Sequence, residues 1–322
     1  MCYIHTLMKV VTSLAEADVS QQPSVVSIGN FDGLHLGHRE ILTTVVKRAR
    51  ELGLRSVAMT FSPHPIRFLA PDRAPRMIST LDQKIRLIRE TGIDLLFIAT
   101  FDLPFSRLSP EEFVEQYLIG RLQARWVCVG GNFNFGYKQR GTIDTLRQFE
   151  SQFEIIEVPP VRVRGTTVSS SRIRQLVGQG QVSRACRLLG RWFDIEGKIV
   201  SGAGRGRTMK VPTLNVEPDN DLIPDRGVYV SRIALDGGPL MDAVTNVGIR
   251  PTFDETSLTI ETFVLNNAVP EGVARARLEF LHRLRDEKRF NSPDELRAQI
   301  GIDVRRAQRF FSSVFGSSAR CG

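Results

Sequence analysis

Hydrophobic and polar positions follow two different patterns in the two halves of the chain. In the first half, short apolar runs are separated by amphipathic stretches in which apolar residues recur every three or four positions. The apolar runs cover residues 25–29, 56–61, 94–100, 126–129 and 154–158, and the amphipathic stretches cover about residues 36–52 and 81–90. Buried strands that alternate with helices are typical of a parallel sheet covered on both faces. We therefore predict an α/β domain in the first half.

The pattern changes after about residue 178. Short β-rich runs at residues 196–200, 227–235, 259–265 and 274–282 are separated by segments rich in glycine and proline. This pattern predicts a small antiparallel barrel or sandwich. Ser-Pro-Glu-Glu at 109–112 and Ser-Pro-Asp-Glu at 292–295 each predict the start of a helix, the second one closing the chain. We place the domain boundary between residues 183 and 184, in the polar connector GQGQVSR.

The composition fits two globular domains. The 322 residues are 42% apolar and 24% charged, and no run of 18 apolar residues predicts a membrane span. The first ten residues lack the charged and apolar regions of a signal peptide. The four cysteines, at positions 2, 128, 186 and 321, are too widely spaced for a zinc cluster. Scattered thiols without a leader predict a cytoplasmic protein.

The net charge of +8 is spread over both halves. There are 22 basic against 17 acidic residues up to residue 183, and 21 against 18 after it. A basic arm for nucleic acid would be lopsided, so we expect neither a nucleic-acid partner nor a membrane partner. Small anionic substrates such as nucleotides fit an even excess, and so does a generally arginine-rich composition. The charge pattern does not indicate an oligomeric state.

The most informative segment is SIGNFDGLHLGH at residues 27–38. A predicted strand ends at Gly29, a glycine-bearing turn follows, and a predicted helix begins near residue 36. Ligands of parallel α/β sheets bind beyond the carboxyl ends of strands, and helix N-termini favour phosphate. His35 and His38 are three residues apart and can face one site. Gly37 between them lets a nucleotide approach the backbone closely.

Two other interpretations of the histidines compete with a nucleotide site. An H-x-x-H pair can bind a metal ion, but no third ligand with helical spacing follows and H-E-x-x-H is absent. Either histidine alone is more often a satisfied polar residue at a helix start. The glycines around the pair favour the nucleotide site.

The spelling G-x-F-D-G-x-H-x-G-H resembles the signature of the HxGH nucleotidyltransferase superfamily. It is closest to the flavin-specific branch, the prokaryotic bifunctional riboflavin kinase/FAD synthetase family. Three more segments resemble family motifs in the same order, namely TFSPHP at 60–65, GGNFNFG at 130–136 and VSSSRIR at 168–174. The resemblance implies a Rossmann-like nucleotidyltransferase domain at residues 1–183. Its implied reaction is adenylylation of FMN by ATP, giving FAD and pyrophosphate.

The resemblance also implies roles for residues of the first domain. His35 and His38 would hold the reacting phosphates, and Arg174 would bind the triphosphate with its planar fork. The other ATP-binding residues implied are Gly29, Phe31, Gly37, Ser170 and Ser171, and the flavin-binding residues are Phe61, Pro63, Asn132 and Phe133. Phe61 and Phe133 equally suit ordinary core packing. Adenylyl transfer needs no covalent enzyme intermediate, so positioning and charge neutralisation carry it.

The second half opens with a Gly/Arg-rich segment, GAGRGRTMKVPTLN at 202–215, which is not a Walker loop. Its end resembles the riboflavin kinase motif GRxxGxPTxN. NVGIRPT at 246–252 resembles NxGxRPT, and IET at 260–262 resembles the strand that bears the kinase carboxylate. The resemblance implies a riboflavin kinase domain at 184–322, built as a small antiparallel β-barrel closed by a helix.

The implied kinase residues are few. Gly206 and Arg207 would bind ATP, and Thr213 and Asn215 would carry Mg²⁺ through oxygen atoms. Glu261 would accept the proton of the ribityl 5′-hydroxyl as it attacks the γ-phosphorus. By residue type alone, a Gly/Arg loop is commonly a solvated turn, and Glu261 also fits a solvent-facing strand position.

Three departures from the kinase pattern keep alternatives open. Lys210 stands where the family has glycine, Phe263 stands where histidine is common, and a Leu-Tyr-Gly segment is missing between residues 266 and 275. One alternative is therefore an FAD synthetase with an impaired kinase half. Others are an adenylyltransferase for a pantetheine or nicotinamide phosphate, and a flavin- or nucleic-acid-binding regulator without catalysis. The PTLN segment argues against an adenylyltransferase for another phosphate. Intact His35 and His38 argue against a regulator without catalysis.

Overall fold

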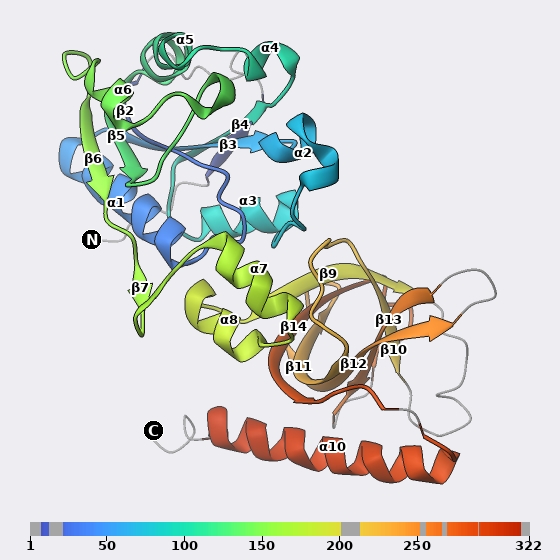
Figure 1. Cartoon of the computed structure of the whole chain (residues 1–322). Coiled ribbons are helices and arrows are strands. Elements are labelled where there is room, and N and C mark those ends of the chain that lie inside the picture. The colour runs from blue at the N-terminus through green and yellow to red at the C-terminus, as the bar shows by residue number, and fades with distance from the viewer. Residues whose placement is uncertain are drawn as a thin grey trace. The chain divides into compact units, whose positions relative to one another are not determined.

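The structure is a computed structural model that describes residues 8–12, 22–200, 213–251, 256–265, 269–288 and 290–316. The chain divides into two compact units, Met1–Ser170 and Ser171–Gly322. Each unit has its own sheet (Figure 1). In the described part of the chain, no helix has the length and apolar character needed to cross a membrane.

The first unit is built on a six-stranded parallel sheet with strand order β1-β4-β3-β2-β5-β6. All neighbouring strands run parallel. The strands are β1 (Lys9–Val11), β2 (Ser24–Ile28), β3 (Arg55–Ser62), β4 (Leu95–Thr100), β5 (Ala124–Gly130) and β6 (Glu154–Val158). The α/β prediction is confirmed, and the five predicted strands are β2 to β6.

Helices cover both faces of this sheet (Figure 1). They are α1 (Leu36–Leu52) and α3 (Leu81–Arg89) on one face, and α5 (Pro110–Phe113), the π-helical η3 (Val114–Arg121) and α6 (Ile143–Arg147) on the other. Strand residues enter the two cores alternately. Val25 packs with Leu42 of α1, whereas Val26 packs with Leu118 of η3. This alternation is the reason that both faces of the strands are apolar.

Short elements fill the loops of the first unit. They are α2 (Pro65–Leu69), η2 (Pro71–Arg73), α4 (Leu103–Ser106), η4 (Tyr137–Gln139), β7 (Arg162–Val163) and β8 (Thr166–Thr167). The predicted helix start at Ser109 is confirmed. Its Oγ accepts a hydrogen bond from Glu112 N at 3.1 Å, and Ser109 N donates to Glu112 Oε2 at 2.7 Å.

The direction in which strands are added to the sheet reverses between β2 and β5. From β2 the chain adds β3 and β4 on one side, and it then returns to the other side of β2 with β5 and β6. In open α/β sheets, ligands bind at such a reversal, outside the carboxyl ends of the strands. The two segments that leave these ends are residues 29–35 after β2 and residues 131–136 after β5.

The second unit contains a closed antiparallel barrel with strand order β10-β13-β12-β11-β14-β9. The strands are β9 (Phe193–Val200), β10 (Leu214–Pro218), β11 (Gly227–Leu235), β12 (Met241–Pro251), β13 (Thr256–Val264) and β14 (Arg275–Arg285). The barrel prediction is confirmed. Phe193, Tyr229 and Phe280 fill the interior, with ring centroids 5.3–6.3 Å apart.

Two helices, α7 (Ser170–Gly178) and α8 (Val182–Leu189), precede the barrel. In α8, Ser183 Oγ donates to Leu281 O of β14 at 2.7 Å, and Asp225 N donates to Val177 O of α7 at 3.3 Å. The compact units divide after Ser170, the first residue of α7, whereas the sequence places the boundary in the connector between α7 and α8. The end of an independently folding first domain stays a prediction.

The long helix α10 (Pro293–Val314) packs on the outside of the barrel, as predicted for a closing helix. Its Ala307 and Phe311 form a buried cluster with Leu281. Arg285 of β14 also binds Asp303 of α10, with Nη2 and Nε each within 2.9 Å of Oδ2. Both side chains are largely buried, with exposed fractions of 12% and 3%. This ion pair fixes α10 to the barrel.

We expect Asp303→Ala to lower the free energy of unfolding of the second unit by about 3–5 kcal/mol, because Arg285 would keep a largely buried charge without its counter-charge. Urea unfolding followed by the fluorescence of Trp192 measures the effect. Asp294→Ala removes an exposed carboxylate from the same helix and should cost less than about 1 kcal/mol. Equal losses in the two variants would contradict a role for the buried pair in holding α10.

Candidate active sites

The first candidate site is the turn between β2 and α1, residues 29–35. Its backbone is unusual, since Phe31 and Leu34 have positive φ angles of 46° and 34° although neither is glycine. Gly33 has φ of 76°, and a Cβ there would lie only 2.7 Å from Ile78. A Cβ at Gly29 would likewise press on the ring of Phe31, at 3.0 Å. The turn therefore depends on glycine at both positions.

Hydrogen bonds to Asp32 connect this turn to two other segments of the first unit. Its buried carboxylate accepts hydrogen bonds from the backbone N–H groups of Ile78 and Ser79, at 3.0 and 3.2 Å. Ser79 Oγ in turn accepts from Gly33 N at 3.1 Å. The carbonyl oxygen of Asp32 accepts from Ser170 Oγ at 3.0 Å. The sequence motifs at residues 27–38 and 168–174 are thus joined by a hydrogen bond at Asp32.

The two histidines lie against each other at the start of α1. His35 caps the helix, because its Nδ1 accepts a hydrogen bond from His38 N at 3.2 Å. Their rings stack with centroids 3.6 Å apart, and the ring of Phe31 lies nearly perpendicular to that of His38, with centroids 5.4 Å apart. Burial, together with the nearby His35 and Lys84, holds the pKa of His38 well below its ordinary value of 6.5. His38 is therefore neutral at pH 7.

A buried cation, missed in the sequence, lies next to this turn. Lys84 of α3 is 6% exposed, and its Nζ lies 3.4 Å from Thr60 Oγ1. Burial lowers the pKa of Lys84 to about 8, opposed by the negative charge of Asp32. The sequence does carry a signal, because Lys84 shares the apolar stripe of its helix with the buried Leu87 and Ile88. Lysine at such a position is rare.

The predicted flavin-binding residues lie at the carboxyl ends of β3 and β5, with Phe61 inside β3 and the other three in the loops that follow the two strands. Phe61, whose ring lies 5.7 Å from Phe105, belongs to an aromatic cluster, and Pro63 follows a cis peptide bond. Phe133 stacks on Phe135 with centroids 5.3 Å apart, whereas Asn132 is exposed. Phe61 and Phe133 pack against the core and are only partly buried. Their rings therefore combine core packing with a partly accessible surface.

The remaining predicted residues of the first site separate into two groups. Gly37 lies beside His35, where a Cβ would be 3.3 Å from the imidazole, and Ser170 joins the turn through Asp32. Ser171 and Arg174 lie on α7, in the second compact unit. Arg174 is half-buried and follows Ser170 by about one helical turn.

The second candidate site is assembled by strand register in the barrel. Glu261 of β13 lies opposite Asn215 of β10 on one side and opposite Asn246 of β12 on the other. Directly opposed residues of antiparallel strands point to the same face. Thr213 lies one residue before the start of β10 and is half-buried. The barrel therefore brings Asn215 and Glu261 together, half-buried, and adds Asn246 to them.

Gly248 reveals a further carboxylate next to this group. A Cβ at Gly248 would overlap the carboxylate of Glu287 and would lie 3.2 Å from Asn246 Nδ2. Glu287 was not predicted, because it follows β14 and is distant in sequence. Phe263, where the family commonly has histidine, packs against the cluster of Ala307 and Phe311 under α10. An apolar ring at position 263 therefore suits this chain's own helix packing.

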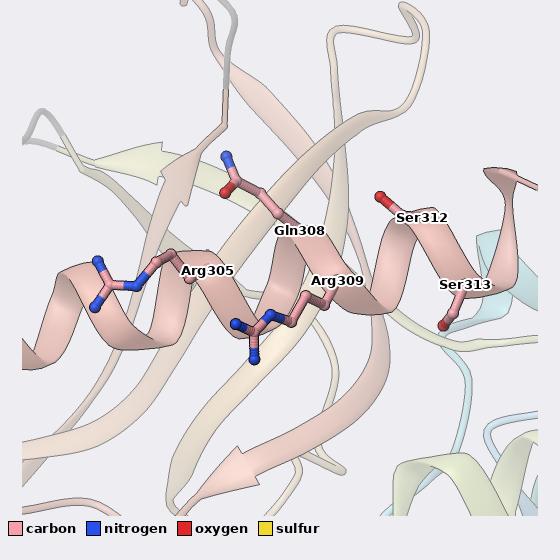
Figure 2. Close-up of a pocket in the computed structure, with 5 residues that line it drawn as sticks. All are labelled: Arg305, Gln308, Arg309, Ser312 and Ser313. Carbon is pink, nitrogen blue, oxygen red and sulfur yellow. The ribbon is translucent and has the colours of Figure 1, made fainter.

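The predicted ATP-binding residues Gly206 and Arg207 lie outside the described residues, and so does Lys210. A shallow hollow on α10, shown in Figure 2, is lined by Arg305, Gln308, Arg309, Ser312 and Ser313. None of these residues belongs to the two candidate sites.

Together these features define a class of protein. The first unit has a turn with two stacked histidines at the switch point of a parallel sheet, and the second has a polar cluster on a closed barrel. A switch point of a parallel sheet is where α/β enzymes commonly bind their ligands, so this arrangement fits an enzyme of two units.

Comparison with known proteins gives the family. The family described as FAD synthetase matches residues 17–172, and the riboflavin kinase family matches residues 189–311. A bifunctional riboflavin kinase/FMN adenylyltransferase of Bacillus subtilis is 34% identical over 91% of this chain and 94% of its own length. One from Escherichia coli K12 is 32% identical over 95% and 97%, respectively. The chain belongs to the bifunctional riboflavin kinase/FMN adenylyltransferase family, which confirms the resemblance.

The likeness extends to a solved structure. A crystal structure from Streptococcus pneumoniae, described as that of a macrolide-efflux protein, superimposes with a TM-score of 0.84 at 28% sequence identity. It covers 94% of this chain and 99% of its own. Both units of the fold are therefore shared with that protein.

The lowered pKa of His38 makes the stability of the first unit pH-dependent. The unfolded chain binds a proton near pH 6.5, but folded His38 binds it only at lower pH, so stability is lost as the pH falls below about 6.5. We expect His38→Gln to reduce this loss in urea unfolding followed by Trp126 fluorescence between pH 7.5 and 4.5. An NMR titration in which the imidazole of His38 protonates at or above pH 6.5 would refute the neutral assignment.

Proposed function

We propose that this chain makes FAD from riboflavin in two ATP-dependent steps. The barrel unit phosphorylates riboflavin to FMN, and the α/β unit adenylylates FMN and releases pyrophosphate. The observation that carries the proposal is the turn after β2, in which a capped pair of stacked histidines lies at the switch point of a parallel sheet. Family membership supports both activities.

In the adenylylation step, a phosphate oxygen of FMN attacks the α-phosphorus of ATP. A new P–O bond forms, the bond to the bridging oxygen of the β-phosphate breaks, and pyrophosphate leaves. His38 and Arg174 stabilise the charge that develops on the phosphates. The backbone at Gly29 and Gly37, with Phe31 and Ser171, forms the ATP cradle at the helix N-termini.

Phe61, Pro63, Asn132 and Phe133 are proposed to hold the flavin. The partly buried rings of Phe61 and Phe133 provide apolar surface, and the exposed amide of Asn132 provides hydrogen bonds. Phe61 lies at the end of β3 and the other three follow β3 or β5, and both strands are neighbours of β2, which leads into the proposed ATP cradle.

In the kinase step, the ribityl 5′-hydroxyl attacks the γ-phosphorus of ATP, and ADP leaves. Glu261 accepts the hydroxyl proton, and the neighbouring Asn215 and Asn246 orient the reacting groups. The cross-strand pairing of Glu261 with both asparagines supports this assignment. Gly206 and Arg207 are proposed to contact ATP on the sequence motif alone.

The donor set of the barrel fits Mg²⁺. The Thr213 hydroxyl and the Asn215 amide carbonyl are oxygen ligands, and Mg²⁺ commonly takes only one or two protein ligands together with phosphates and water. When bound, the metal neutralises charge on the transferring phosphates. Thr213 and Asn215 would hold it on the face of Glu261.

Alternative phosphate substrates are less well supported. A pantetheine or nicotinamide adenylyltransferase has no need of the barrel unit, whereas the relatives described above share both units with this chain over more than nine-tenths of its length. An impaired kinase half is not favoured, because Asn215 and Glu261 lie opposite each other on the neighbouring strands β10 and β13. The free thiols of Cys128 and Cys186 support a location in a reducing cytoplasm.

A product assay with two variants tests both halves. Riboflavin and ATP should give FMN and FAD, separated by chromatography. His38→Ala should cut FAD formation about 10²–10³-fold and leave FMN formation intact, because a contact to the developing charge is lost in one unit only. Glu261→Gln should cut FMN formation about 10²–10⁴-fold, while FAD is still made from supplied FMN. Loss of both activities in either variant would contradict the division of labour.

The boundary proposed at residues 183 and 184 is tested with a fragment. Residues 1–183 retain Ser170, Ser171 and Arg174 on α7 and should fold and adenylylate FMN. Residues 1–170, which end at the division between the compact units, lack Arg174 and should fail to do so. Circular dichroism checks folding, and FAD release checks activity. A folded but inactive 1–183 fragment would mean that the second unit completes the site.

A further inference from the structure

A buried lysine remains without a role in the steps proposed above. We propose that Lys84 is a positioning residue of the adenylylation site, which fixes the turn after β2 through Thr60 and Asp32 and presents a positive charge to His38. This inference rests on the proposed function of the first unit. It concerns a residue of α3 that lies outside all four sequence motifs of that unit.

The hydrogen bonds through Thr60 have a fixed direction. An ammonium group has only donors, so Lys84 Nζ donates to Thr60 Oγ1, at 3.4 Å. The hydroxyl proton of Thr60 is then directed to the carbonyl oxygen of Asn30, at 3.3 Å. Asn30 lies between Gly29 and Phe31, two residues of the proposed ATP cradle. The Thr60 hydroxyl group therefore connects Lys84 to the backbone of that cradle.

Charge connects Lys84 to the same turn. Asp32 interacts favourably with Lys84, and the Asp32 carboxylate is itself held by Ile78 N and Ser79 N. Lys84 in turn disfavours the protonated form of His38. The stacked His35 acts on His38 in the same sense.

Two other cations of α1 and α3, Arg39 and Arg86, have Glu90 as an ion-pair partner. Arg39, which follows His38 on α1, pairs with Glu90 after the end of α3 at 3.4 Å. Burying a lysine is costly because its ammonium group loses its hydration, which is also the main cause of the lowered pKa of Lys84. A lysine kept at this position is therefore better explained by the site than by stability.

The test compares Lys84→Met, Lys84→Arg and Lys47→Met, the last replacing an exposed lysine on α1. The kcat/KM of FAD formation from FMN and ATP is measured from pH 5 to pH 10. We expect Lys84→Met to lower it about 10²-fold, as for the loss of a preorganised electrostatic contact. The wild-type protein should lose activity above about pH 8, where Lys84 deprotonates.

The pH profile of kcat/KM distinguishes a positioning role of Lys84 from a purely structural one. Lys84→Met should lack the basic limb, and its acid limb should move to higher pH because His38 loses a nearby cation. Lys84→Arg should keep the acid limb and move the basic limb beyond the measured range, since guanidinium stays charged. The unfolding midpoint of Lys84→Met should not fall, and Lys47→Met should match the wild type throughout.

Several outcomes would overturn the inference. One is wild-type kcat/KM in Lys84→Met, and another is a lower rate with both limbs unmoved, which is the behaviour of a structural lysine. If Lys84→Met does not fold, a folded Lys84→Arg with the wild-type basic limb overturns it as well. A wild-type protein that makes no FAD from FMN would instead refute the proposed function.

Discussion

Asp32, in the turn after β2, joins three distant segments of the first unit through its buried carboxylate and its backbone carbonyl group. Asp32 accepts from the backbone of Ile78, 46 residues away, and its carbonyl oxygen accepts from Ser170, 138 residues away. A buried carboxylate without donors would be very costly, so the turn forms only when the segment at Ile78 is in place. The strained φ angles at Phe31 and Leu34 are maintained by this anchor. The geometry of the histidines depends on it in turn.

The barrel unit fixes its candidate site by a different means. On the interior face, hydroxyl groups of Ser231, Thr245 and Thr262 form a buried chain, with oxygens 2.7 and 3.0 Å apart. Thr262 is the neighbour of Glu261, so a slip of one residue would place Glu261 in the interior and Thr262 outside. The buried chain of hydroxyls therefore defines the register that sets Glu261 beside Asn215. One site is positioned by an anchored turn and the other by strand register.

The sequence predicted the elements whose pattern is local. Helix α1 and strands β6 and β11 begin and end where the periodicity placed them, because their apolar positions repeat regularly. Strand β1 is only three residues long, and β12 lacks a regular alternation because Thr245 and Asn246 are adjacent and Gly248 follows, so neither was predicted. Helix α8 was read as part of a connector, since its apolar stripe is short and its exposed face is rich in arginine. Its packing on β14 is a long-range property that no local pattern contains.

The charge state of the first site could likewise be predicted from the sequence only in part. The spacing of His35 and His38 predicted a shared site, but not their stacking, which disfavours positive charge on both rings. Because His35 Nδ1 accepts a hydrogen bond and the pKa of His38 is low, the imidazoles act near neutral pH as hydrogen-bonding groups rather than as cations. The positive charge at the turn is contributed instead by Lys84, from another helix, and with a pKa of about 8 it is largely retained at pH 7. A sequence motif can thus specify the groups that contact a substrate, whereas the positive charge beside those groups comes from a residue outside the motif.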